Sequence, residues 1–220
     1  EGFTSTLPCS TVDYYLRVSN GSPQNPPSLR NDDLFVGRWN NPADRRRYTR
    51  HPVIFFNSNF RNLAGSVQSA TLNLYYRNIG NGTASSLDLR AYRINRNWDT
   101  AQPLNYNYTF FRNSLVTENS TTTISTQPSQ RTISLNVKDT VEAWSTGSPN
   151  FGLLVQQDPA WPSGSTPPAQ WSDRLLNLDS SRNSDQTSPY LEIVTAASGA
   201  ADLTDGGSSI STIRFYPGEM

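Results

Sequence analysis

His51 is the only histidine in this 220-residue chain, and it is the first residue to consider for catalysis. A Ser-His-Asp triad would have to use this imidazole, which stands directly before Pro52 and the apolar stretch VIFF. The sequence contains neither a GxSxG nucleophile elbow nor an HExxH zinc motif. Its 18 acidic residues offer many carboxylate pairs, so their spacing gives no signal for glycoside hydrolysis. We therefore expect a protein that is not an enzyme.

Cys9 and a pair of aspartates are the candidates for redox chemistry and metal binding. Because Cys9 is the only cysteine, the chain cannot form an internal disulfide. Its thiol is then either buried or free, or it bridges to another chain. Asp32 and Asp33 precede the stretch LFVG, where two carboxylates and backbone carbonyls could bind Ca²⁺. The alternative is that these acids pair with nearby arginines; no other cofactor is expected.

Loop tryptophans and an arginine cluster are the candidates for sugar binding. Aromatic rings stack on the C–H faces of sugars, and guanidinium groups pair with the carboxylates of acidic sugars. The candidate residues are Trp39, Trp161, Trp171, Arg45, Arg46 and Arg47, with Arg50 close by. The alternative is that the tryptophans fold back over the core and that the arginines make surface ion pairs.

Four Asn-x-Ser/Thr sequons are candidates for N-glycosylation in a secreted protein. They begin at Asn20, Asn81, Asn107 and Asn119. Other classes of partner receive no support from the composition. The formal net charge is +0, so no global field attracts the protein to nucleic acid. No apolar run approaches the ~20 residues that a membrane-spanning helix needs.

The elements that position these residues are predicted to be mainly strands, because apolar and polar residues alternate along the chain. In ATLNLYY (70–76), Leu72, Leu74 and Tyr76 share one face, and the later Asn-Gly pair of NIGNGT predicts a hairpin turn. The other predicted strands are DYYLRV (13–18), VIFF (53–56), SLDLRAYRI (86–94), RTISLNV (131–137), FGLLVQQ (151–157) and YLEIV (190–194). Strands this short, separated by Pro, Gly, Asn and Ser, are typical of an antiparallel β-sandwich or jelly roll.

One segment has helical periodicity, and four connections are expected to be loops. Val137, Val141 and Trp144 form one stripe of a short helix over 137–145, with Asn136 as a plausible N-cap. We expect Trp144 to lie in the core. The long polar connections are 19–34, 38–49, 103–130 and 158–185. Loops of this length in a compact domain are usually functional.

The domain organisation is predicted as an N-terminal arm (1–12), a jelly-roll domain (13–194), a flexible linker (195–209) and a C-terminal strand (210–220). The linker is rich in small and polar residues. Ile210, Ile213 and Phe215 look like one face of a short strand and are expected to anchor it, together with Phe3 and Leu7 in the N-terminal arm. This strand could fold back onto its own sheet, or it could complete the sheet of a neighbouring copy.

Four stretches together carry a family resemblance. These are SVQSATLNLYY, LDLRAYRINRNW, LNVKDTVEAWSTGSPNFGLLV and SPYLEIV, of which the third is the most specific. The chain from about residue 13 to 194 resembles the DNRLRE-type domain, a jelly-roll module of secreted bacterial and archaeal proteins. The resemblance implies a non-catalytic β-sandwich, sometimes one that binds acidic polysaccharides. The chain departs from the family pattern after Trp98, where Asp99-Thr100 replaces a common Glu and a Thr-Trp pair.

These patterns together predict a non-enzymatic extracellular structural protein. We expect it to build a filament or surface layer from copies of itself, joined through exchange of terminal strands. The alternatives are a carbohydrate-binding module for an acidic polysaccharide and a cell-surface adhesin.

Overall fold

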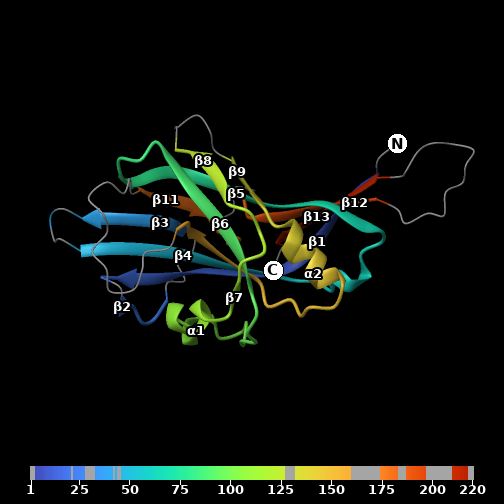
Figure 1. Cartoon of the computed structure of the whole chain (residues 1–220), viewed down its shortest axis with the longest axis horizontal. Helices are drawn as coiled ribbons and strands as arrows, with labels where there is room; N and C mark the ends of the chain where they lie inside the picture. Colours follow the sequence, from blue (N-terminus) through green and yellow to red (C-terminus); the bar gives the residue numbers. More distant parts are fainter. Residues whose placement is uncertain are drawn as a thin grey trace, which may run out of the picture.

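The computed structural model shows a mostly β protein with two short α-helices (Figure 1). It describes residues 3–20, 22–27, 33–41, 43, 46–126, 132–159, 174–182, 187–196 and 210–217. The strands are β1 (Phe3–Ser19), β2 (Ser22–Pro23), β3 (Asp33–Asn41), β4 (Arg46–Asn57), β5 (Ser66–Gly82), β6 (Ser86–Ile94), β7 (Leu115–Val116), β8 (Thr122–Ser125), β9 (Thr132–Asn136), β10 (Leu153–Gln157), β11 (Arg174–Asp179), β12 (Tyr190–Ala196) and β13 (Ile210–Pro217). The helices are α1 (Tyr108–Arg112) and α2 (Lys138–Ser145), with 3₁₀ turns η1 (Phe60–Asn62) and η2 (Pro103–Asn105).

The strands form one large, mostly antiparallel sheet that curves into a ring. Its pairing order runs β1-β13-β12-β5-β11-β3-β4, and β4 pairs in turn with β1, which closes the circuit. A branch continues from β4 through β10 and β6 to β7 and β8. Antiparallel pairing and curvature of this kind let one face of each strand point inward while the other meets solvent or a covering segment. The predicted all-β sandwich class is confirmed.

The main core fills the inside of this curved sheet, and the sequence alternation explains how. Leu72, Leu74 and Tyr76 of β5 are each at most 1% exposed. They pack in one cluster with residues of β3, β6, β10, β11 and β12. Alternate residues of a strand point to the same face, so the predicted apolar face of this strand is the buried one.

A second apolar cluster lies on the other face of β1, β4, β6 and β10, beneath α1 and its flanking loop. Its buried members are Tyr14, Leu16, Val53, Ile94, Trp98, Phe111 and Leu154. Asn107 caps α1, because its side chain accepts a hydrogen bond from the Phe110 amide. The stretches VIFF and FGLLVQQ are therefore apolar on both faces because each face meets a different core.

The predicted helix over 137–145 is confirmed as α2. Val141 and Trp144 are buried, and Trp144 is 1% exposed, so its predicted place in the core is confirmed. The Asn136 side chain accepts a hydrogen bond from the Lys138 amide at 3.0 Å, one position earlier than a regular cap would place it. Among the described residues, no helix is long and apolar enough to cross a membrane.

Two connectivity predictions were wrong. The Asn-Gly pair does not close a hairpin, because β5 pairs with β9, β11 and β12 whereas β6 pairs with β7, β8 and β10. The connection after Gly82 instead leads from one part of the sheet to another. The polar connections expected to be loops contain regular elements: β2 and the start of β3 in 19–34, the end of β3 and the start of β4 in 38–49, η2, α1, β7 and β8 in 103–130, and β11 in 158–185. These elements are short or polar, or, like β11, lie within a long polar stretch, so their pattern is weak in the sequence.

Candidate functional sites

The two terminal segments of the described chain lie side by side within one subunit. Strand β13 inserts between β1 and β12, parallel to β1 and antiparallel to β12. The β1 pairing runs in register from Phe3 opposite Ser211 to Cys9 opposite Pro217. The predicted N-terminal arm is therefore the first half of β1, which continues without a break through the predicted boundary at residue 12. The residues between Ala196 and Ile210, predicted as a linker, lie outside the described residues.

The anchor residues of β13 divide between its two faces. Phe215 is 5% exposed and belongs to the main core, where Ile213 packs against it as a partly buried neighbour. Ile210 is 47% exposed. The prediction that all three share one face was wrong, because residues three apart in a strand point to opposite faces. Leu7 of β1 is 43% exposed, and the side chain of Phe3 lies outside the described part of the structure.

Phe60 links the terminal strand to helix α2. Its ring packs edge-on against Phe215 with centroids 5.3 Å apart, and it stacks on Trp144 at 4.9 Å. Near the surface, Arg214 of β13 also pairs with Glu192 of β12, with Nε 2.6 Å from Oε2. The terminal strand is thus held by backbone hydrogen bonds on both sides, by the contact of Phe215 with Phe60 and by the ion pair of Arg214. The ring of Tyr216 also stacks on Tyr190 of β12, with centroids 4.7 Å apart.

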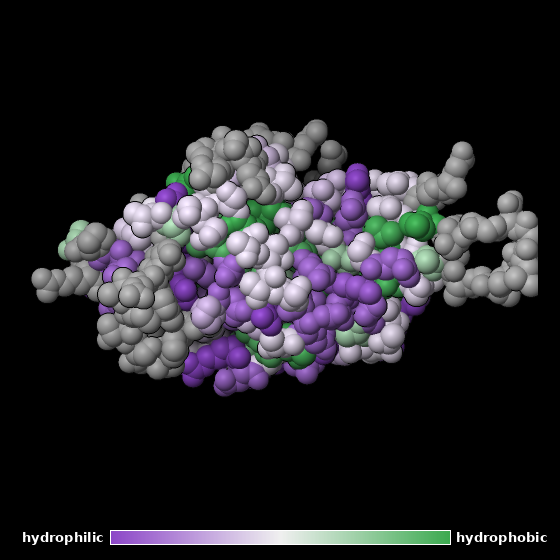
Figure 2. Space-filling view, turned by 45° about the horizontal axis from the view of Figure 1, so that its top comes forward, coloured by the Kyte–Doolittle hydropathy of each residue, from purple (hydrophilic) through white to green (hydrophobic). Residues whose placement is uncertain are grey.

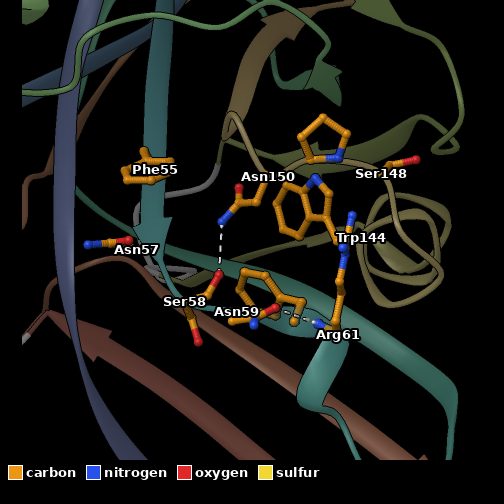
Figure 3. Close-up of a pocket in the computed structure, with 10 residues that line it drawn as sticks. Phe55, Asn57, Ser58, Asn59, Arg61, Trp144, Ser148 and Asn150 are labelled. Carbon is orange, nitrogen blue, oxygen red and sulfur yellow. Dashed lines mark hydrogen bonds between the residues drawn. The ribbon is translucent and has the colours of Figure 1, made fainter.

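A pocket of about 310 Å³ opens next to Phe60, where β4 ends (Figure 3). Three aromatic residues line it, and its polar residues come from the end of β4, from η1 and from the turn before β10. The lining residues are Phe55, Asn57, Ser58, Asn59, Phe60, Arg61, Trp144, Ser148, Pro149 and Asn150. Much of the polar rim is already engaged: the Asn150 amide donates to the Phe56 carbonyl at 2.8 Å, and Arg61 donates to the Gly147 carbonyl.

Trp39 lies on strand β3 and not in a loop. It is directly opposite Tyr48 of β4, and the two rings stack with centroids 5.7 Å apart. The Arg50 guanidinium lies 5.3 Å from the Tyr48 ring, and burial lowers the pKa of Arg50. The result is a partly exposed stack of two aromatic rings and a cation. Trp161, Trp171 and Arg45 lie outside the described residues.

The two remaining arginines of the predicted sugar site begin β4. Arg46 is exposed, and Arg47 is half-buried. The backbone amide of Arg47 donates to the Asn20 side chain at 2.9 Å. The structure therefore brings Arg46, Arg47, Tyr48 and Trp39 to the same end of the β3–β4 pair.

His51 is buried beneath α1 and is 5% exposed. Its ring stacks on Tyr108 with centroids 4.4 Å apart, and its Nε2 lies 3.1 Å from the Thr49 hydroxyl. Burial, with a smaller effect of the nearby Arg50 cation, lowers the pKa of His51 to about 3. An imidazole with so low a pKa is neutral at physiological pH, and the partner of its ring here is a hydroxyl and not the carboxylate that a catalytic triad uses.

Asp33 pairs with an arginine that lies far from it in the sequence. In β5, the Arg77 Nη1 lies 3.9 Å from the Asp33 Oδ1. The Arg77 Nε lies 2.8 Å from the Oδ1 of Asp179 in the adjacent strand β11. Asp32 lies outside the described residues. Within the described ranges no group of three or more His, Cys, Asp or Glu side chains is placed to hold a metal ion. Cys9 is buried, and burial raises the pKa of its thiol, as expected for the buried alternative.

The four sequons differ in their surroundings. Asn20 is exposed, with φ of 49°, whereas the side chain of Asn81 is outside the described residues. Asn107 caps α1 and donates to the Asn25 side chain at 2.9 Å. Asn119 is 1% exposed, and its Nδ2 donates to both the Ala91 carbonyl and the Thr140 hydroxyl. A glycan on Asn119 is incompatible with this packing, because it would replace one of these protons inside the fold.

Comparison of the chain with known protein families finds no family model that matches it. A comparison with curated proteins finds no match either. The resemblance to DNRLRE-type domains therefore stays a prediction from the quoted sequence stretches.

Proposed function

We propose that this protein is a non-enzymatic, extracellular structural subunit that assembles with copies of itself by exchanging its C-terminal strand. The observation that carries the proposal is the position of β13. A terminal strand of eight residues fills a slot between β1 and β12 and supplies Phe215 to the core.

The same slot can accept the strand of a neighbouring copy, because every contact of β13 with the rest of the fold is made by residues that each copy carries. The exchanged and unexchanged forms then have the same strand pairing and the same core, so they differ little in contact energy. A head-to-tail exchange that does not close into a ring produces a filament, and this open form is the one proposed here. The exposed sequon at Asn20 is in keeping with an extracellular location.

Cross-linking between subunits tests the exchange directly. Thr4 and Thr212 are opposite each other in the β1–β13 pairing. We would make Thr4→Cys in one tagged chain and Thr212→Cys in another, both with Cys9→Ser, and refold the two chains together. Strand exchange predicts a disulfide between the two different chains under mild oxidation.

The double variant Thr4→Cys/Thr212→Cys in a single chain is the matched control. Its two cysteines form a disulfide within one chain when the strand stays in its own subunit. A mixture that gives no disulfide between different chains, while the double variant closes internally, contradicts the proposal. Electron microscopy of the protein lacking residues 206–220 gives a second readout. Filaments that persist without the terminal strand also contradict it.

A carbohydrate-binding module is the second candidate, and the stack of Trp39, Tyr48 and Arg50 favours it. An aromatic pair beside guanidinium groups can bind the C–H face and carboxylate of an acidic sugar. Isothermal titration with uronate polymers tests this candidate. Binding that is lost in Trp39→Ala supports it, and no heat with any uronate polymer opposes it. A cell-surface adhesin would use the same surfaces, and the sequence and fold give it no separate support.

A further inference from the structure

Two arginines lie opposite each other on adjacent strands near one end of the sheet. Arg17 of β1 and Arg50 of β4 are register partners in an antiparallel pair. Residues opposite each other in such a pair project to the same face of the sheet, with Cα atoms about 5 Å apart. Tyr15 of β1 and Ile54 of β4 lie on this face and belong to the main core. The two arginines therefore lie beyond the end of the main core, on the inner face of the sheet.

Among the described residues, no carboxylate pairs with either of these arginines. The Arg17 Nη2 donates to the Pro26 carbonyl at 2.8 Å, and the Arg50 Nη1 donates to the Thr49 carbonyl at 2.9 Å. Five other arginines do pair with an aspartate or glutamate: Arg77, Arg90, Arg93, Arg182 and Arg214. Like charges opposite each other in adjacent strands are destabilising, so a negative charge between Arg17 and Arg50 would stabilise the pair.

Both arginines are also partly withdrawn from water. Each is only half-buried, but the Arg17 Nε is buried without a hydrogen-bond partner. Burial lowers the pKa of Arg50, and the Arg17 cation lowers it as well. A cation that is poorly hydrated attracts an anion more strongly than a fully exposed one, because the effective dielectric constant around it is lower.

The pair lies at the opposite end of the molecule from the terminal strands. In Figure 1 the end of β1 and the start of β4 lie toward the left, whereas β12 and β13 extend to the right. Figure 2 shows hydrophilic residues in purple at the surface toward the same left end. The stack of Trp39 and Tyr48 lies beside Arg50. Because both arginines are partly exposed, a ligand from solvent can reach them next to these rings.

We propose that Arg17 and Arg50 together bind one oxyanion group, a carboxylate or a sulfate. Guanidinium groups form strong charge-assisted hydrogen bonds with such groups, which match their planar fork of donors. The bound charge offsets the repulsion between the two cations. This group has two sources: a free inorganic oxyanion, or an acidic sugar whose ring lies against Trp39 and Tyr48. The oxyanion site is independent of strand exchange, and only the sugar as its source rests on the second candidate function.

Calorimetric titration of the 220-residue protein with sodium sulfate, in a chloride buffer, tests the inference. We expect binding of one sulfate per subunit. Its affinity should fall by at least about tenfold in Arg17→Gln and in Arg50→Gln, because each variant loses a charged donor. No sulfate binding by the unmodified protein would overturn the inference.

Arg96→Gln is the matched control, because it removes the same charge from a different place. Arg96 is exposed, lies over the Phe110 ring and donates to the Phe110 carbonyl. Sulfate affinity should stay within about threefold of the unmodified protein, since salt screens an exposed charge. Equal losses in Arg17→Gln, Arg50→Gln and Arg96→Gln would show a general charge effect and overturn the site.

NMR of the unmodified protein keeps the test decisive if a variant fails to fold. Thermal unfolding shows which variants fold. In the unmodified protein, the Nε–H signals of Arg17 and Arg50 should shift together as sulfate is added, while the signal of Arg96 stays in place. Signals of Arg17 and Arg50 that do not move would overturn the inference whatever the variants do.

Glucuronate, with neutral glucose as its control, separates the two sources of the oxyanion. Glucuronate that binds more tightly than sulfate, and less tightly in Trp39→Ala, supports the site with an acidic sugar as its ligand. Glucuronate that binds no more tightly than sulfate, with no effect of Trp39→Ala, supports it with a free oxyanion. Glucose that binds as tightly as glucuronate, with no effect of Arg17→Gln, would overturn the oxyanion site and leave the carbohydrate-binding candidate standing.

A failure of this inference can be told apart from a failure of strand exchange. The disulfide between Thr4→Cys and Thr212→Cys chains reports exchange and does not involve Arg17 or Arg50. Sulfate binding without that disulfide supports the oxyanion site and contradicts exchange. The disulfide without sulfate binding does the reverse.

Discussion

His51 gives a prediction whose size can be worked out from the structure. Its pKa is lowered to about 3 by burial, whereas an imidazole in the unfolded chain titrates near 6.5. Between these two values the unfolded chain binds a proton that the folded protein does not, so lowering the pH stabilises the unfolded state. Each pH unit below 6.5 is worth about 1.4 kcal/mol, so at pH 5 the free energy of unfolding should fall by about 2 kcal/mol on this account.

The variant His51→Gln isolates this effect. Glutamine does not titrate, and it can keep a hydrogen bond to the Thr49 hydroxyl while losing the stacking on Tyr108. Loss of the stacking lowers stability by a constant amount at every pH. The difference between the two proteins should therefore shrink by about 2 kcal/mol from pH 8 to pH 5.

Urea unfolding followed by tryptophan fluorescence at several pH values measures this difference. Carboxyl groups that titrate in the same range affect both proteins and cancel in the subtraction. His51 is the only histidine, so its proton NMR signals also report its charge without overlap. Parallel stability curves for the two proteins between pH 7 and 5, or an imidazole signal that titrates near 6.5 in the folded protein, would refute the reasoning.

Three further predictions concern stability, each measured by urea unfolding. Tyr14→Phe should leave the free energy of unfolding unchanged or raise it by about 1 kcal/mol, because the buried Tyr14 hydroxyl has no hydrogen-bond partner among the described residues. A loss of more than about 1 kcal/mol would show that the hydroxyl has a partner after all. Gly37→Ala should lower the free energy of unfolding by at least about 2 kcal/mol, because φ is 109° and an added Cβ would lie 2.2 Å from the Arg174 carbonyl oxygen. Gly147→Ala should cost less: φ is also positive there, at 124°, but an added Cβ would meet only the Arg61 side chain, at 3.9 Å. Phe215→Ala should lower it by about 3–5 kcal/mol as a buried aromatic deletion, and a loss below about 1 kcal/mol would mean that β13 adds little to the core.

The fold class could be predicted from the sequence because the strands that build the core alternate strongly. Leu72, Leu74 and Tyr76 mark the buried face of β5. Val141 and Trp144 mark the buried stripe of α2. The first part of β4 escaped prediction because Arg46 and Arg47 give it a polar pattern. Strand β11 escaped prediction although it carries Leu175, Leu176 and Leu178, because this short apolar run lies within a long polar connection. The connection after Gly82 was misread because an Asn-Gly pair also occurs where a chain leaves one part of a sheet for another.

The candidate site was harder to predict because it depends on contacts between distant segments. Trp39 looks like a loop residue until β3 and β4 pair and place it opposite Tyr48. Asn119 begins a glycosylation sequon, yet its side chain is buried and donates hydrogen bonds to Ala91 of β6 and Thr140 of α2. Neither partner is near Asn119 in the sequence.

The parallel arrangement of β1 and β13 has a mechanical consequence. Tension applied at Phe3 and at Pro217 pulls these neighbouring strands in opposite directions along their length, and the hydrogen bonds of the whole register resist together instead of opening one after another. Because resistance to forced unfolding depends on the unfolding rate and not on equilibrium stability, this geometry favours a subunit that withstands stretching.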